Sequence, residues 1–201
     1  SEGTRGSLSK FLIDNFNLSE GKDFQKYAIG LKEVWEIKEE NFSEGLVEHS
    51  MGWPLSDGTN GGSFLYHFDK NLVSIGYVIH LNYTNPYASP FDEFQQFKTH
   101  PSVKKTLIGG KRLSYGARAI TTGGYQSVPK LNFPGGALIG CSAGFLNYPK
   151  IKGTHNAMES GMLAAEAIIE KKLSKDENNN LENYQLKYEK SRIFKELKKV
   201  R

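Results

Sequence analysis

The sequence predicts a mixed fold, α+β with an α/β part, in which a mainly antiparallel β-sheet is flanked by helices. Short runs rich in β-branched and aromatic residues lie between residues 27 and 81, with Gly, Asn and Asp in the turns that separate them. Residues 136–165 then read as a strand, a glycine-rich loop and a helix. With 201 residues, 38% of them hydrophobic, the chain is long enough to bury a core.

The first part of the chain is expected to form a helix followed by strands. In residues 7–16 the apolar side chains follow helical spacing, with Ser7 as the expected N-cap. An antiparallel meander of about four strands is expected next, from the sequences YAIGLKEVWEI, GLVEHSMGW, GSFLYHF and NLVSIGYVIHL.

The middle of the chain predicts a short aromatic helix. Phe91, Phe94 and Phe97 are spaced for a helix. It should end near His100, because Pro101 disfavours a helical conformation in the residue before it. The sequence KRLSYGARAI is the next expected strand.

The last third of the chain predicts mostly helix. Residues 137–139 are expected to form a compact buried strand. A helix should run from Thr154 to about Lys171, and a second, polar helix should run from Leu181 to Val200 after the linker DENNN.

Composition excludes several kinds of site. The net charge is +4, and six of the 26 Lys and Arg residues lie in residues 190–201. We interpret this local cluster as a solvated helix face, so no nucleic-acid partner is expected. One cysteine, Cys141, excludes an internal disulfide and an iron–sulfur cluster held by this chain alone. The five histidines lack a paired ligand spacing, so no metal site is expected.

The sequence also predicts no membrane-spanning helix and no targeting segment of its own. No run approaches the roughly 18 consecutive apolar residues that a spanning helix needs. Residues 1–9 resemble neither a signal peptide nor a transit helix, so we expect any targeting sequence to lie outside this chain.

The glycine-rich segment GALIGCSAGFLNYPKIKGTHNAMESGMLAA is the most informative part of the sequence. Gly140 and Gly144 let backbone amides approach a ligand without obstruction by a Cβ atom. The following helix would offer unpaired N–H groups and a partial positive charge to an electron-rich ligand. A glycine-rich loop between a strand and a helix is more often plain α/β packing than a ligand site, so the pattern by itself indicates only a candidate ligand loop.

The same segment resembles the closing FAD-contact segment of the electron-transfer flavoprotein:ubiquinone oxidoreductase family. Further blocks resemble that family in the same order: GLKEVWEI, GWPL with GGSFLYHF, NPYASPFDEFQQFKTHP, GGKRLSYGARAI and GGYQSVPKLNFPGGALIG. The resemblance covers nearly the whole chain and fades only in residues 172–190. It implies an internal piece of a flavoprotein.

The resemblance implies a division of the chain into four parts. Residues 1–26 would belong to the FAD domain, and residues 27–122 would form the quinone-side sheet domain with one helix. Residues 123–172 would close the FAD domain as a strand, loop and helix, and residues 173–201 would form a C-terminal helical segment.

The resemblance also implies an activity for the full-length protein. It would pass electrons from reduced electron-transfer flavoprotein through FAD and a 4Fe-4S cluster to ubiquinone, at the matrix side of the mitochondrial inner membrane. This chain lacks the GxGxxG loop and the cysteines for the cluster. We therefore expect it to be inactive alone and to bind FAD weakly or not at all, and no catalytic residue is assigned.

Two segments are implied to contact FAD. The sequence SEGTRG would place Gly3 and Arg5 near the cofactor, with Glu2 where related flavoproteins usually carry Asp. Cys141 stands where flavin hydroxylases usually carry Asp, and we expect it to be an inert space filler. The contacts implied in the closing loop are Gly140, Cys141, Ser142, Gly144, Asn147, Gly153, Thr154 and His155.

Two of these closing-loop residues have alternative interpretations. Thr154 would donate a hydrogen bond that tunes the flavin potential, or it would simply cap the helix. His155 would exchange protons near the flavin, or it would be satisfied at a helix start.

The quinone side is implied to depend on Gly61 and Gly62, whose amides would bind a quinone carbonyl, although a simple hairpin turn is the alternative. We expect Phe64 and Tyr66 to lie on alternate faces of their strand, so that only one of the two lines an apolar channel for the quinone. We assign Phe64 to the quinone site.

The aromatic, proline-rich stretch predicts a monotopic membrane surface. Tyr87, Phe91 and Phe94 are the residues assigned to it. Ordinary core packing is the alternative.

Two other functions remain open at this point. One is a FAD-dependent reductase or hydroxylase of an isoprenoid or aromatic substrate that uses NAD(P)H. The other is a non-catalytic binding module.

Overall fold

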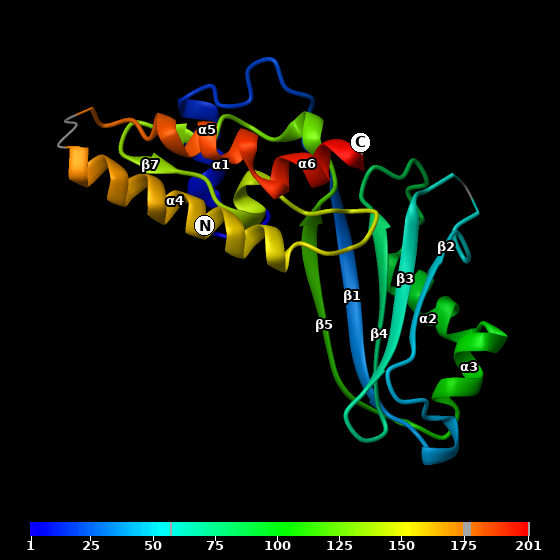
Figure 1. The fold of residues 1–201 in the computed structure, drawn as a ribbon. Coiled ribbons are helices and arrows are strands. Elements are labelled where there is room, and N and C mark those ends of the chain that lie inside the picture. The colour runs from blue at the N-terminus through cyan, green and yellow to red at the C-terminus, as the bar shows by residue number, and fades with distance from the viewer. Residues whose placement is uncertain (57, 175–177, 201) are drawn as a thin grey trace. The chain divides into compact units, whose positions relative to one another are not determined.

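The computed structural model describes residues 1–56, 58–174 and 178–200 (Figure 1). The chain forms two compact units. One contains Ser1–Tyr27 together with Ile120–Arg201, and the other contains Ala28–Ala119. The second unit, called here the sheet unit, is therefore an insertion into the first, called here the outer unit. The mixed fold with a mainly antiparallel sheet is confirmed.

The sheet unit is built on a five-stranded sheet with the order β2-β3-β4-β1-β5. Antiparallel pairing joins β2 to β3, β3 to β4 and β4 to β1. The strands are β1 (Tyr27–Glu36), β2 (Val47–Met51), β3 (Gly61–Phe68), β4 (Leu72–His80) and β5 (Lys111–Thr121).

The expected simple meander is wrong at its first strand, because β1 pairs with β4 and not with β2. Ten residues, including the short 3₁₀ helix η1 (Glu39–Asn41), connect β1 to β2, which is longer than a tight hairpin needs. Strand β4 is buried along most of its length and has a partner strand on each side, while β2 and β5 lie at the edges of the sheet.

One face of the sheet is covered by α2 (Pro90–Thr99) and α3 (Pro101–Leu107). The Ser89 hydroxyl caps α2 by accepting from the Asp92 amide at 3.3 Å. Helix α2 ends at Thr99, as Pro101 predicts. The sequence analysis missed α3, where Pro101 occupies the first turn and needs no N–H partner.

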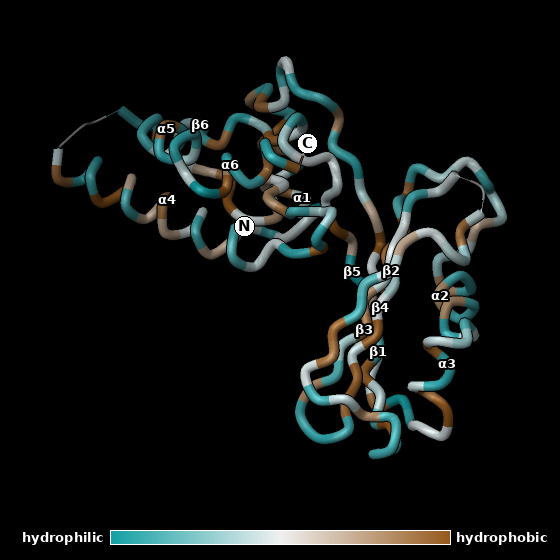
Figure 2. Tube along the Cα trace, turned by 45° about the vertical axis from the view of Figure 1, so that its right-hand side comes forward, coloured by the Kyte–Doolittle hydropathy of each residue, from teal (hydrophilic) through white to brown (hydrophobic). Residues whose placement is uncertain are grey.

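Aromatic and aliphatic side chains fill the space between this sheet face and the helices. Tyr77 and Phe97 have ring centroids 5.0 Å apart. Phe94, which we assigned to a membrane surface, is only 2% exposed and belongs to this core. That assignment is wrong because Phe94 and Phe97 lie three residues apart, on the helix side that faces the sheet. In Figure 2 hydrophobic segments are interleaved with paler and hydrophilic ones along the strands, and the turns between strands are largely hydrophilic.

The other face of the sheet carries a row of aromatic rings from β3. Phe64 stacks on Tyr66 at 5.6 Å, and Tyr66 contacts Phe68 at 5.9 Å. The expectation that Phe64 and Tyr66 lie on alternate faces is wrong, because side chains two residues apart in a strand share a face. Ser63 and Leu65 point to the buried face instead.

The outer unit is mostly helical around one core. Its buried side chains include Leu18, Leu131, Phe145, Tyr184, Ile193 and Leu197. Its elements are α1 (Ser7–Asn15), the 3₁₀ helices η2 (Tyr125–Ser127) and η3 (Gly140–Ala143), the paired strands β6 (Asn132–Phe133) and β7 (Gly136–Ala137), α4 (Thr154–Ser174), α5 (Glu182–Lys190) and α6 (Arg192–Lys199).

Two expected elements of the outer unit differ in the structure. The compact strand at residues 137–139 is reduced to β7, which pairs only with β6 across a turn that contains Gly135 at φ +82°. The single helix expected at Leu181–Val200 is broken at Ser191, whose backbone is extended at ψ 168°. The Ser191 hydroxyl accepts from the Phe194 amide and so starts α6 as a new helix. The expected linker DENNN includes residues 176 and 177, which lie outside the described residues.

Helix α1 is capped by a different residue from the one expected. Gly6, not Ser7, occupies the N-cap position, and glycine has no side chain that could accept a capping hydrogen bond. The Glu2 carboxylate accepts from the Ser9 amide at 2.6 Å and from the Ser9 hydroxyl at 3.0 Å. Glu2 therefore satisfies a free N–H group in the first turn of α1.

Within the described residues, no helix has both the length and the apolar character to cross a bilayer. Helix α4 has 21 residues but carries charged side chains along its length.

Candidate functional site

The two segments implied to contact FAD lie side by side in the outer unit. The Glu2 amide donates to Ser142 Oγ at 2.9 Å, and Ser142 Oγ donates to the Gly3 carbonyl at 3.1 Å. These bonds join residues about 140 positions apart in the chain. The structure thus brings the SEGTRG segment against the loop that begins at Gly140.

A pocket of about 250 Å³ opens beside this junction. Arg5, Thr121 and Ser142 contribute to its lining, together with residues of α1. The Arg5 guanidinium lies over the Tyr27 ring, 5.5 Å from its centroid. The pocket lining therefore combines two cations, Arg5 and Lys10, and the Asp14 carboxylate with hydroxyl groups and an aromatic ring. Its cations and hydroxyl groups suit a polar, negatively charged ligand.

One buried hydroxyl in this pocket has no protein partner. Among the described residues, Thr121 is 3% exposed and its Oγ1 makes no hydrogen bond. A buried hydroxyl without a partner is costly unless a ligand or water satisfies it. This orphaned group fits a polar ligand such as the phosphate or sugar part of FAD.

Glycine is required at two positions of the adjoining loop. Gly140 has φ +61° and Gly144 has φ +82°, both in the left-handed region. A Cβ atom at Gly140 would also lie 3.3 Å from Ala157 Cβ in α4. The Gly140 amide donates to Ser160 Oγ at 3.0 Å, so the loop is held tightly against α4.

Cys141 lies half-buried in η3, between these two glycines. Burial raises the pKa of its thiol, and a hydrogen bond with the Thr4 side chain only partly opposes this effect. The thiol is therefore protonated at neutral pH, which is the behaviour of a packing residue.

Asn147 and His155 lie on a different part of the site, where both contact Glu196. Asn147 is fully buried, and its Nδ2 donates to Glu196 Oε1 at 2.7 Å. His155 Nε2 lies 3.0 and 3.1 Å from the two oxygens of the same carboxylate. Of the two interpretations of His155, the structure shows the residue satisfied at the start of α4. Thr154, the first residue of that helix, is exposed to solvent.

Sequence reasoning missed Glu196. Burial raises its pKa, but the hydrogen bonds from Asn147 and His155 and the charges of His155 and Lys150 outweigh burial and hold the pKa below its usual value. A signal for this residue does exist in the sequence. Glu196 lies beside Leu197 and three residues after Ile193, so a carboxylate borders the buried stripe of α6.

In the sheet unit, Gly61 and Gly62 are strand residues at the start of β3, so the hairpin-turn interpretation is wrong. Gly62 pairs with Met51 on one side and with Val78 on the other. A Cβ atom at Gly62 would lie 2.9 Å from the Ser50 carbonyl, and one at Gly61 would lie 2.7 Å from the Val78 carbonyl. Close packing of neighbouring strands therefore requires glycine at both positions.

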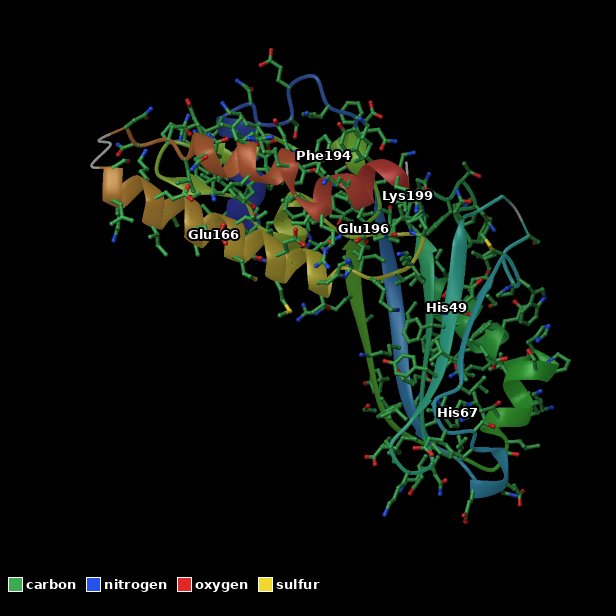
Figure 3. All side chains as sticks on the ribbon, viewed as in Figure 1. His49, His67, Glu166, Phe194, Glu196 and Lys199 are labelled. Atoms are coloured by element: carbon green, nitrogen blue, oxygen red, sulfur yellow. The ribbon has the colours of Figure 1, made fainter. Side chains whose placement is uncertain are left out.

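A second pocket, of about 220 Å³, lies on the helix-covered face. Its lining includes Met51 and Ser63, which are the strand partner and the chain neighbour of Gly62, but neither glycine of the pair. The Ser50 and Ser63 hydroxyls are 2.6 Å apart, and the Trp53 and His100 ring centroids are 5.1 Å apart. Both pairs contribute to the lining, as does His49 of β2, which is labelled in Figure 3. Phe64, which we assigned to the quinone site, lies on the opposite face and does not line this pocket.

A buried ion cluster holds α2 against the sheet, and the sequence analysis did not find it. The Glu33 side chain, 3% exposed, accepts from Lys98, from Arg112 at 3.2 Å and from the Trp35 indole at 2.7 Å. Burial raises the Glu33 pKa, but the hydrogen bonds from Lys98 and Trp35 lead the effects that bring it below its usual value.

The other two residues assigned to a membrane surface are exposed. Tyr87 is 92% exposed and Phe91 is 57% exposed. Phe91 lies in the first turn of α2, and Tyr87 lies in the connection that leads to this helix.

No group of three or more His, Cys, Asp or Glu residues in the described part of the chain is placed to hold a metal ion.

Solved flavin-dependent enzymes share this fold. A geranylgeranyl bacteriochlorophyll reductase-like protein from Thermoplasma acidophilum matches with a TM-score of 0.66 and 18% identity, over 87% of this chain and 43% of that chain. Halogenase PltM matches with a TM-score of 0.56 and 16% identity, over 89% of this chain and 37% of that chain. These likenesses show that the chain shares a fold with these two proteins.

The family follows from closer relatives. Residues 27–120 match the family model of the ubiquinone-binding domain of ETF-QO. The chain is 53% identical over 207 residues to the mitochondrial electron transfer flavoprotein-ubiquinone oxidoreductase of Homo sapiens, covering 100% of this chain and 34% of that protein. The Pseudomonas aeruginosa enzyme is 58% identical over 169 residues, covering 84% of this chain and 31% of that protein. The chain belongs to the electron transfer flavoprotein-ubiquinone oxidoreductase family and spans about a third of the length of these relatives.

Proposed function

We propose that this chain is the quinone-side domain and closing flavin segment of an enzyme that oxidises reduced electron-transfer flavoprotein and reduces ubiquinone. The match of residues 27–120 to the ubiquinone-binding domain carries this proposal. The pocket beside Gly62 supports it, because it offers a concave surface with paired hydroxyls and aromatic walls.

The outer unit would supply part of an FAD site. Arg5 would meet a negatively charged group of the cofactor, while the Thr121 and Ser142 hydroxyls would meet polar groups. When bound, FAD would accept and release the electrons. A 4Fe-4S cluster, if present, would lie elsewhere in the protein, because this chain has a single cysteine.

We further propose a mitochondrial location, at the matrix side of the inner membrane. The relatives from Homo sapiens and Saccharomyces cerevisiae are named mitochondrial, which supports the organelle. Exposed Tyr87 and Phe91 would touch the bilayer surface as a peripheral contact.

The test is an electron-transfer assay on the family-length protein that contains this segment. With reduced electron-transfer flavoprotein as donor, we expect reduction of a short-chain ubiquinone. Failure to reduce the quinone would reject the proposal. Direct oxidation of NAD(P)H would instead identify a reductase or hydroxylase.

A second measurement concerns the 201-residue chain by itself. We expect FAD to be lost during gel filtration, because the chain lacks a GxGxxG loop. FAD retained at one equivalent per chain would contradict this expectation.

A further inference from the structure

The carboxylate of Glu196 joins three elements of the outer unit. It accepts from Asn147 in the loop before α4 and contacts His155 in the first turn of α4, while Glu196 itself belongs to α6. Figure 3 shows Glu196 on α6 beside the loop that leads into α4. A single side chain thus ties the C-terminal helix to both ends of residues 147–155.

Hydrogen bonds within the loop also contribute to its shape, because the Ile151 amide donates to the Tyr148 carbonyl at 3.0 Å and the Lys150 amide donates to Asn147 Oδ1 at 3.4 Å. Asn147 and Lys152 exchange backbone hydrogen bonds of 2.9 and 3.2 Å, which close the loop at its base. Ile151 has φ +54°, a strained conformation for a β-branched residue. Such a conformation persists only where the surroundings hold it in place. The contacts of Asn147 with Glu196 are therefore important for the shape of the loop.

A second ion pair joins the same two helices without touching the loop. Arg192 of α6 contacts Glu159 of α4, with Nη2 and Oε2 separated by 3.0 Å. His155 and Glu159 lie one turn apart on α4, and Arg192 and Glu196 lie one turn apart on α6. These two ion pairs form parallel links between α4 and α6, and of the two it is the Glu196 link that reaches the loop.

We propose that Glu196 is a positioning residue for the closing flavin loop, which it acts on through Asn147 and His155. This inference rests on the proposed function, because the loop matters to the reaction only if it contacts FAD. The Glu159–Arg192 link would hold the helices together, and Glu196 would in addition fix the loop. Loss of Glu196 should therefore loosen the loop and change the environment of the flavin.

The first experiment measures hydrogen exchange of the 201-residue chain without cofactor. Glu196→Gln keeps the volume but removes the charge-assisted bonds, so exchange at the Asn147 and Lys152 amides should accelerate by about tenfold. Glu159→Gln is the matched control and should leave these two amides unchanged. Equal acceleration in both variants would overturn the proposal, since it would reveal a general link between helices.

The second experiment measures the flavin midpoint potential in the family-length protein with FAD bound. We expect Glu196→Gln to shift the potential and weaken FAD binding, with no such change in Glu159→Gln. An unchanged potential and affinity in Glu196→Gln would overturn the proposal even if the enzyme reduces quinone. A wild-type protein that binds FAD but fails to reduce quinone would instead reject the proposed function. Circular dichroism and thermal unfolding of both variants would verify that each one folds.

Discussion

Lys98 on α2 donates to both carboxylate oxygens of Glu33 on β1, at 2.9 and 2.8 Å. Both side chains are largely removed from solvent. The Lys98 ammonium also lies 4.8 Å from the centre of the Phe94 ring. The ion pair between Lys98 and Glu33 therefore holds α2 on the sheet, and each buried charge depends on the other.

Replacing Lys98 with Met should destabilise the chain by about 3 kcal/mol, because a buried carboxylate loses its main partner. Chemical denaturation of the 201-residue chain measures the effect. Lys38→Met is the matched control, since Lys38 pairs with Glu40 at 3.6 Å on the exposed surface. This control should change stability by less than about 1 kcal/mol. Similar losses in the two variants would contradict a special role for the buried pair.

Acid should remove the contribution of Glu33 to stability. Its pKa is lowered in the folded protein, so its contribution is fully present above the unfolded-state value of about 4.3. It is lost as the pH falls through the lower folded-state pKa. The stability difference between wild type and Glu33→Gln, measured by denaturation from pH 7 to pH 3, should therefore shrink below about pH 4. A constant difference across this range would show that ionisation of Glu33 is irrelevant.

Adding a methyl group at Gly62 should distort the pairing of β2 with β3. The new Cβ would lie 2.9 Å from the Ser50 carbonyl, so Gly62→Ala should cost about 1–3 kcal/mol. Gly116→Ala in β5 is the control, because no atom lies within 4 Å of its Cβ position. Thermal unfolding compares the two variants. The quinone KM of the family-length enzyme should rise for Gly62→Ala alone, and an equal rise in both variants would count against a quinone site here.

Removing the exposed aromatic rings should weaken contact with a bilayer. The double variant Tyr87→Ser, Phe91→Ser loses apolar surface that would enter the interface, so binding to phosphatidylcholine–cardiolipin vesicles should fall by roughly tenfold. Sedimentation of the family-length protein with vesicles measures it. Phe24→Ser, at a residue equally open to solvent in the outer unit, should bind as wild type does. An unchanged double variant would exclude this surface from membrane contact.

Local patterns in the sequence predict much of the fold. The alternation of β3, the apolar run of β4, the aromatic spacing of α2 and the stop at Pro101 all act over a few residues, and each is visible in a short window. The pairing of β1 with β4 is different, because it depends on which distant strand needs a partner. The break at Ser191 has a signal in the sequence, because serine is a favoured N-cap residue and its hydroxyl accepts from the Phe194 amide. The helical spacing of apolar residues on both sides of Ser191 nevertheless predicts one continuous helix.

The candidate site was less accessible from sequence. Glycines with positive φ, such as Gly140 and Gly144, mark a loop, and the resemblance assigned a ligand to it. The partner of His155 lies 41 positions away, on α6, and no local rule connects them. The same holds for Glu33, whose lysine is 65 positions distant. Charged pairs across such separations depend on tertiary structure, which a single sequence does not display.

The first and last residues of the sheet unit lie close together in space. Strands β1 and β5 are adjacent in the sheet, and just outside the unit the Thr122 amide donates to the Lys26 carbonyl at 2.8 Å. A segment whose two ends meet can be exchanged between host proteins as one cassette, without rerouting the chain that carries it. A protein engineer can therefore exchange the sheet unit as one piece by cutting at residues 27 and 120.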